Sequence, residues 1–565
     1  MDAQPATEVK TTQESSDEVG ASSRAGSTVA TTKDEESVVP ASSERHPREG
    51  WPKWRYPLVL IMFAQVGLLS GYDVSNTANI QPPIYEAFGQ VHLLPWVAIG
   101  YTALNVAAVP LARRVVVLGN LKWQVVASCV VFFVGSVVSG AAKSISSVII
   151  GRAIQGIGGA GIYQLNLVVS LLITTPTELP QIQGATAVAW AVGLTLGPVI
   201  GGAFAENQHA TWRWAMYINL PLLGMILLTT FIALPDLYAT NVPPFMEGLR
   251  TIDWTGVVLH TAGFVLLCSA LVFSGSTWSW SSHSAIVAWV FVGVIYAAYV
   301  LQQKFALLTT KERRNIPADL YRNRTVSLIC AATYAVGACY GIALYYIPLY
   351  FAFTKGFEPV EAAVRLLPFI FTFIIFTIVV AGLIPRLGIY APFYVAGGAF
   401  AIVGGSLQAQ LTPTTSQSRL MGVSSLIGAG VGCMWQTGVT VLARSVPERR
   451  RVDVSMIFIM SQLIGVSLTL ALAGCVFNNV GFNRLRTTLD GLGFSDFDIR
   501  EALAGLDSKV WRDTDPRLLR AAVEDVTHVI ANIQYLIVAG GIVAFVSGCL
   551  MKWERLDFSK GDEKK

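Results

Sequence analysis

The sequence predicts an all-helical protein that crosses a membrane many times. Of its 565 residues, 53% are hydrophobic and only 13% are charged, whereas about 25% of the residues in a soluble chain carry charge. The mean hydropathy is +0.53, and apolar stretches of about 20 residues, the length that spans a bilayer, follow one another along most of the chain. So few charged side chains could not cover several soluble domains of this total length.

The first fifty residues differ from the rest of the chain. Residues 1–50 are rich in Ser, Thr, Glu and Lys, and no long apolar run precedes Pro57. Such a segment buries too little apolar area to offset its ordering entropy, and it lacks the short apolar core of a signal peptide. We expect a disordered tail here and a second, short tail at 556–565.

Fourteen apolar stretches after this tail are long enough to cross a bilayer. Short turns with Pro or Gly separate most of them. The expected spans are 57–79, 93–117, 121–142, 146–172, 182–205, 214–235, 254–275, 284–304, 326–353, 361–384, 388–410, 420–444, 452–477 and 529–551.

Lys and Arg in the short loops set the expected orientation, because basic loops stay in the cytoplasm. With the amino terminus inside, the basic clusters at 113–114, 311–324 and 449–451 all fall on the cytoplasmic side, and the opposite loops are poorer in basic residues. Both tails are then cytoplasmic. The longer segment 478–528 is then an extracytoplasmic loop, and its spaced apolar residues predict one or two amphipathic helices.

Composition and motifs exclude several classes of function. The formal net charge of +4 is too small to indicate a nucleic-acid partner. The seven Cys lie singly inside apolar runs, without the spacing of a metal site. Residues 156–161 have the GxGxxG spacing of a dinucleotide-binding turn, but they lie inside a continuous apolar helix and not between a strand and a helix. We therefore expect no enzyme activity, no cofactor and no metal.

Two ionisable residues inside expected spans are the leading functional candidates, because a charge at the centre of a membrane helix costs about 2.5–3.5 kcal/mol on insertion scales. Asp73 lies in the first span and Arg152 in the fourth. Only the carboxylate can gain and lose charge, because Arg stays protonated. Asp253 and Arg365 begin later spans, where water can screen them. Purely structural hydrogen bonding is the alternative for both Asp73 and Arg152.

Small residues follow one face of the fifth expected span. Spacings of four and eight residues place them near one side of a helix, where another helix can pack closely, and a proline bends the strip. The strip consists of Gly184, Gly193, Gly197, Pro198, Gly201 and Gly202. We interpret it as a gating seam that bends during conformational change, with a static packing groove as the alternative.

Several segments carry motifs that occur together in one family. They are the glycine-rich stretch 151–161, the strip 184–202, and the segments 212–221, 253–256, 345–351 and 365–368. In combination, over about residues 56–555, the chain resembles the major facilitator superfamily, and specifically its fungal-type fourteen-span drug:H+ antiporters.

The resemblance implies two six-helix bundles with an extra helix pair between them and a central cavity near mid-membrane. On this chain the bundles take 51–235 and 311–555, and the extra pair takes 236–310. One loop departs from the family pattern: Arg113 stands where Gly is usual, and Val117 stands where an Asp is usual. That Asp is thought to latch the cytoplasmic gate, so we expect this gate to be held differently or less tightly.

The resemblance also implies transport of a small organic substrate coupled to protons. Asp73 and Arg152 are then the proton-coupling pair. The cavity is expected to be lined by Asn76, Gln155, Gln164, Trp190, Tyr345, Tyr346, Trp435 and Gln436, although a helix-packing contact is the alternative for each. Such a lining suits an amphiphilic or aromatic molecule better than a strongly charged one.

Three functions stay open at this point. The leading one is efflux of drugs, toxins or a secondary metabolite across the plasma membrane, by a monomer embedded in the lipid bilayer. The second is import, or transport across the vacuolar membrane, of a nutrient such as amino acids, vitamins or iron chelates. The third is a membrane sensor that keeps the fold and does not transport.

Overall fold

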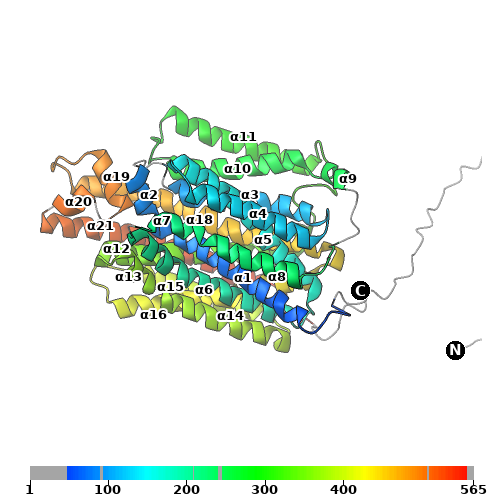
Figure 1. The fold of residues 1–565 in the computed structure, drawn as a ribbon. Helices are drawn as coiled ribbons and strands as arrows, with labels where there is room; N and C mark the ends of the chain where they lie inside the picture. Colours follow the sequence, from blue (N-terminus) through cyan, green and yellow to red (C-terminus); the bar gives the residue numbers. More distant parts are fainter. Residues whose placement is uncertain are drawn as a thin grey trace, which may run out of the picture. The chain divides into compact units, whose positions relative to one another are not determined.

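Helices make up almost all of the structure, a computed structural model (Figure 1). It describes residues 48–88, 93, 95–207, 209–239, 245–505, 508–513 and 515–556. Within them, pairing of the strand type is limited to two isolated bridges, Asn120 with Tyr238 and Ser274 with Trp278. The expected tails at 1–50 and 556–565 lie almost wholly outside the described residues.

Helices occupy all fourteen expected spans. Ten of the spans form single helices among the described residues: α1 (Arg55–Asn79), α3 (Pro95–Val116), α4 (Leu121–Gly140), α5 (Ile145–Ile173), α6 (Leu179–Glu206), α10 (Trp254–Phe273), α11 (His283–Phe305), α12 (Arg324–Lys355), α15 (Ala391–Gln408) and α18 (Arg451–Thr488). Four are interrupted pairs: α7 (Thr211–Tyr217) with α8 (Asn219–Ala233), α13 (Pro359–Val364) with α14 (Leu367–Leu387), α16 (Gln417–Met434) with α17 (Thr437–Ser445), and α21 (Pro516–Ile533) with α22 (Tyr535–Leu550). The connections hold α2 (Gln81–Phe88), α9 (Phe245–Arg250), η2 (Leu320–Arg322), η3 (Glu448–Arg450), α19 (Asp496–Ala504) and α20 (Lys509–Asp513).

Twelve helical stretches of the described chain are both long and apolar enough to cross a membrane. Neither α3 nor α15 is among them: α3 ends with Arg113 and Arg114 in its last turn, and Gly, Ser and Gln residues lower the mean hydropathy of α15. The multi-span helical architecture is thus confirmed, whereas the count of fourteen spans stays a prediction.

The helix boundaries follow local chemistry. Asn120, Ser282 and Asn323 each accept a hydrogen bond from a backbone N–H in the first turn of the helix that they begin, which satisfies a donor that the helix itself leaves unpaired. Gly356 and Gly388 end α12 and α14 with φ of 68° and 70°, a left-handed conformation that side chains disfavour.

The helices form two bundles with the same contact pattern. In the first, α1 packs on α6 and α8, α5 packs on α3 and α4, and α4 also packs on α8. In the second, α12 packs on α18 and α22, α16 packs on α14 and α15, and α15 also packs on α22. Each pair in one bundle has a counterpart in the other, as in transporters built from repeats.

Two helix pairs provide most of the contact between the bundles. They are α3 with α18 and α6 with α14, and the extra pair, α10 and α11, reaches both bundles through the contacts of α10 with α3 and α18. No contact tests the expected residue boundaries near 235 and 310, so these stay predictions.

The expected outer segment is more helical than the sequence suggested. Helix α18 continues to Thr488, beyond the expected end at 477, because Phe482 and Leu485 extend its buried face. It packs there on α19 and α21. Helix α21 buries Ala522, Val526, Val529 and Ile530 on one side, as an amphipathic helix does.

Candidate functional site

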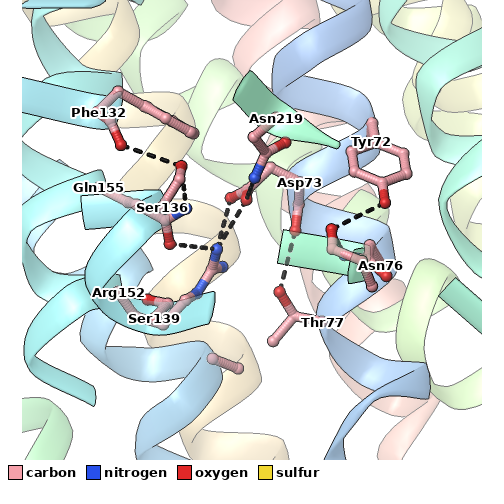
Figure 2. Close-up of polar contacts among 12 residues, drawn as sticks. Tyr72, Asp73, Asn76, Thr77, Phe132, Ser136, Ser139, Arg152, Gln155 and Asn219 are labelled. Atoms are coloured by element: carbon pink, nitrogen blue, oxygen red, sulfur yellow. Dashed lines mark hydrogen bonds and ion pairs between the residues drawn. The ribbon is translucent and has the colours of Figure 1, made fainter. Parts of the chain in front are cut away.

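Asp73 and Arg152 form a buried ion pair inside the first bundle (Figure 2). Arg152 Nη1 lies 2.8 Å from both Oδ1 and Oδ2 of Asp73. The exposed fractions are 0% for Asp73 and 1% for Arg152. An unpaired charge at such a place would be costly, so each side chain depends on the other.

Further polar groups form hydrogen bonds with both side chains of the pair. Asn219 Nδ2 donates to Asp73 Oδ1 at 2.9 Å. Arg152 also donates to Gln155 Oε1 at 3.0 Å and to the Val97 carbonyl at 3.2 Å, and its guanidinium lies 4.5 Å from the centre of the Tyr101 ring. Arg152 therefore has acceptors and an aromatic face besides the carboxylate.

A cavity lies beside this network, between the two bundles. Aromatic side chains from both bundles form much of its wall: Tyr101, Tyr163, Trp190, Tyr340 and Trp435. Its volume is about 50 Å³, room for a few water molecules. A larger organic molecule can enter only when the bundles separate.

Polar and aromatic contacts hold the bundles together around the cavity. Trp190 Nε1 donates to Tyr340 Oη at 3.1 Å, and Tyr163 Oη donates to Gln462 Oε1 at 3.0 Å. The ring centroids of Trp190 and Trp435 lie 6.3 Å apart in an edge-on arrangement, which favours association of the rings. Opening the cavity must break these contacts.

The residues predicted to line the cavity divide into several environments. Trp190 and Trp435 line the cavity, and Gln155 belongs to the ion-pair network, where it donates to Ser136 Oγ. Asn76 Nδ2 donates to the Ala215 carbonyl, and Gln164 Nε2 donates to Ser455 Oγ across the bundles.

The other three predicted lining residues lie elsewhere. Gln436 lines a separate pocket of about 10 Å³, Tyr346 is buried against Phe477, and Tyr345 is 42% exposed. A role of these residues in substrate binding stays a prediction.

Sequence reasoning missed several residues of the site, among them Asn219 and three tyrosines of the cavity wall. Asn219 is a single polar residue in an apolar stretch, which was a usable signal. Tyr101, Tyr163 and Tyr340 resemble many other aromatic residues in spans, and only the packing of the helices distinguishes them.

The glycine strip on α6 faces two different partners. A Cβ atom at Gly193, Gly197 or Gly201 would overlap atoms of α1 in the same bundle. At Gly197 these atoms are the Ser75 hydroxyl and, at 2.9 Å, the backbone nitrogen of Asn76. Gly184 instead faces Ala381 on α14, where a Cβ would lie 2.9 Å from the Ala381 Cβ. Gly202 is buried and Pro198 is half-buried. Among the described contacts of the glycines in this strip, the contact across the bundles is thus that of Gly184 with Ala381.

The loop that departs from the family pattern makes its own contact between the bundles. Arg113 Nε lies 2.7 Å from Asp453 Oδ1 at the start of α18, and Arg113 Nη1 donates to the Asn315 carbonyl at 3.1 Å. Arg450 lies 2.6 Å from Asp453 Oδ2 and 2.8 Å from Asp319. Arg113, Arg450, Asp319 and Asp453 form what we call the inner charge cluster.

Asp253 and Arg365 have local roles. Asp253 begins α10, accepts from the Gly256 amide, and also accepts from Gln302, Gln303 and the Asn315 amide. Arg365 pairs with Glu361 one turn earlier at 2.8 Å. Among the described residues, no group of three or more His, Cys, Asp and Glu side chains is arranged to hold a metal ion.

Comparison with known proteins agrees with the fold described above. Residues 63–470 match the pattern of the Major Facilitator Superfamily. "Efflux pump patC" of Aspergillus clavatus is 32% identical over 89% of this chain and 91% of its own. The "Phomenoic acid biosynthesis cluster MFS-type transporter" of Leptosphaeria maculans is 30% identical over 87% of this chain and 81% of its own. In fold, the chain is similar to the human organic anion transporter MFSD10 (TETRAN), with a TM-score of 0.53 and 12% identity over 88% of this chain and 100% of that one.

Proposed function

The chain belongs to the major facilitator superfamily, and we propose that it is a secondary transporter that exports a small organic molecule across the plasma membrane in exchange for protons. Membership of this family makes the chain a multi-pass membrane transporter and not an enzyme. Direction, substrate, membrane and proton coupling are the proposed part.

The observation that carries the proposal is the buried Asp73–Arg152 pair beside a cavity between two bundles. Val74, the neighbour of Asp73, and Tyr101, which covers Arg152, both line that cavity. A substrate that moves either residue changes the surroundings of the ion pair.

Protonation of Asp73 removes the counter-charge of Arg152 but leaves Arg152 its neutral partners. When Asp73 takes up a proton, Arg152 keeps Gln155, the Val97 carbonyl and the Tyr101 ring as partners. Protonation therefore weakens the link between α1 and α5, and deprotonation restores it. This exchange couples the charge of one carboxylate to the packing of two helices.

Export is the direction supported by the relatives, because one similar protein is named an efflux pump and another belongs to a biosynthesis cluster. A secondary metabolite, a toxin or a drug is the corresponding class of substrate. A single chain encloses its own cavity, which supports a monomer as the working unit.

The test is uptake of tritiated hydroxymethylcoumarin, an uncharged aromatic alcohol, into proteoliposomes with and without an imposed pH gradient. We expect the gradient to accelerate initial uptake by the wild type, and Asp73→Asn to remove that acceleration while probe binding and exchange at equal pH persist. Glu361→Gln, at a partly exposed carboxylate, is the matched control and should behave as the wild type. Gradient-driven uptake by Asp73→Asn as steep as that of the wild type would exclude Asp73 as the coupling group.

A further inference from the structure

We infer that the cavity selects an uncharged organic molecule that carries both a hydrogen-bond acceptor, such as a carbonyl, and a donor, such as a hydroxyl. This inference rests on the proposed function and defines its class of substrate. It follows from the charge of the cavity wall and from two polar atoms in that wall.

The residues described for the cavity wall carry no formal charge, since none of them is Asp, Glu, Lys, Arg or His. The nearby carboxylate, Asp73, is already bonded on both oxygens by Arg152 and on Oδ1 by Asn219. A cationic ligand would lose its hydration without gaining a counter-charge, which is costly in a low-dielectric site.

In the described part of the wall, a fully buried donor lacks an acceptor. Trp435 is 2% exposed, and its Nε1–H has no hydrogen-bond partner among the described residues. The indole nitrogen is a donor only. Trp435 lies at the two-residue interruption between α16 and α17, and its ring packs 4.5 Å from the Tyr340 ring centre, which restrains its orientation. A carbonyl oxygen of the ligand would satisfy this donor.

A fully buried acceptor in the described wall likewise lacks a donor. Asn105 on α3 is buried, and its Oδ1 has no partner within the described part of the chain. A hydroxyl of the ligand would satisfy it. Asn105 belongs to the first bundle and Trp435 to the second, so one ligand that bonds both atoms would connect the two halves of the transporter.

Entry of the ligand frees two further groups. Trp190 Nε1 and Tyr340 Oη bond each other across the bundles, and their separation offers a second donor and an amphoteric hydroxyl to the ligand. The aromatic rings then stack on a flat, unsaturated ligand. The chemistry of the wall is thus matched by a hydroxylated carbonyl compound with a planar framework.

The test is binding of three probes to the purified full chain, measured by titration calorimetry: hydroxymethylcoumarin, its methyl ether methoxymethylcoumarin, and the cation rhodamine 6G. The ether keeps the carbonyl and lacks the hydroxyl donor. We expect the alcohol to bind roughly fivefold to tenfold more tightly than the ether, the effect of one hydrogen bond in a buried site, and the cation to bind more weakly than both.

Two variants separate the two atoms. Trp435→Phe keeps an aromatic ring and removes the donor, and it should weaken both coumarins about fivefold to tenfold. Asn105→Leu removes the acceptor, and it should abolish the preference for the alcohol over the ether. Trp280→Phe removes a donor that bonds Asn479 outside the cavity, and it should change nothing.

Three results would overturn the inference: tighter binding of rhodamine 6G than of the coumarins, unchanged coumarin affinity in Trp435→Phe, or no binding of the alcohol by the wild type. Failure of the proposed function looks different. In that case the probes bind in the expected order, but a pH gradient does not accelerate uptake.

Discussion

Tyr101 is the side chain that touches both the cavity and the ion pair. It lines the cavity, and its ring faces the Arg152 guanidinium at 4.5 Å. A desolvated contact of this kind contributes about 2 kcal/mol, or roughly 30-fold in an equilibrium. Any substrate that displaces the ring therefore changes how firmly Arg152 is held.

We predict that Tyr101→Leu lowers gradient-driven uptake of hydroxymethylcoumarin by about tenfold or more, because the guanidinium loses its aromatic partner. Tyr101→Phe keeps the ring and should transport nearly as the wild type. Uptake by the Leu and Phe variants is measured in the same proteoliposomes. Equal uptake would show that the Tyr101 ring does not couple the cavity to the ion pair.

For single residues, the position of ionisable side chains inside spans could be predicted from the sequence, whereas the direction in which a side chain points could not. Asp73 and Arg152 were predictable because an ionisable group in an apolar span needs a reason to be there. Asn219 became part of the site only through the packing of α8 on α1. Tyr345 and Tyr346 are neighbours in sequence, but successive helical residues point about 100° apart, so Tyr346 is buried while Tyr345 is exposed.

Among the helices, α6 shows how one row of glycines can serve two purposes. Gly197 lets α6 approach α1 within one bundle, whereas Gly184 lets it approach α14 in the other. Substitutions at the two positions should therefore fail in different ways.

We predict that Gly197→Leu lowers the thermal stability of the purified protein, at a cost of about 1–3 kcal/mol, because the new side chain overlaps backbone of α1. Gly184→Leu should cost less stability, because the Ala381 Cβ that it would overlap belongs to the opposite bundle and the two bundles can shift apart. It should transport poorly, because its bulk hinders the bundles from closing. Gly224→Leu on α8, where a Cβ meets nothing within 4 Å, is the control for both measurements. Similar melting temperatures for the Gly197 and Gly224 variants would contradict this assignment.

Element positions were more predictable than element ends. The apolar stretches gave the places of the helices because span length and hydropathy are local properties. The interruption at Trp435 and Gln436 and the extension of α18 to Thr488 depend on partners elsewhere in the fold, which a local pattern does not contain.

For the whole molecule, the inner charge cluster includes Arg113, a residue at which the sequence departs from the family pattern. The sequence predicted a gate held differently or less tightly. Arg113 contributes a direct ion pair with Asp453 that joins α3 to α18. We propose that this pair helps to keep the cytoplasmic side closed.

Ser467 on α18 also lines the cavity, and a cysteine introduced there, on a background without native cysteines, reports access to it. We predict that Arg113→Gln increases by about threefold to tenfold the rate at which an impermeant maleimide, applied from the cytoplasmic side, labels this cysteine. Loss of one partly buried pair is worth about 1 kcal/mol or somewhat more. Arg324→Gln is the matched control, because Arg324 donates to the Leu550 carbonyl within the second bundle. Equal labelling rates in the two variants would show that Arg113 does not help to keep the cytoplasmic side closed.

The closeness of Trp190 and Trp435 also gives the molecule a built-in optical signal. The two indoles come from opposite bundles, and their centroids are 6.3 Å apart, a separation at which their electronic transitions interact strongly. Such coupling produces a paired positive and negative band in ultraviolet circular dichroism and fades steeply with distance. Rocking of the bundles should therefore weaken that paired band. The opening of the unlabelled protein can then be followed in solution by its circular dichroism.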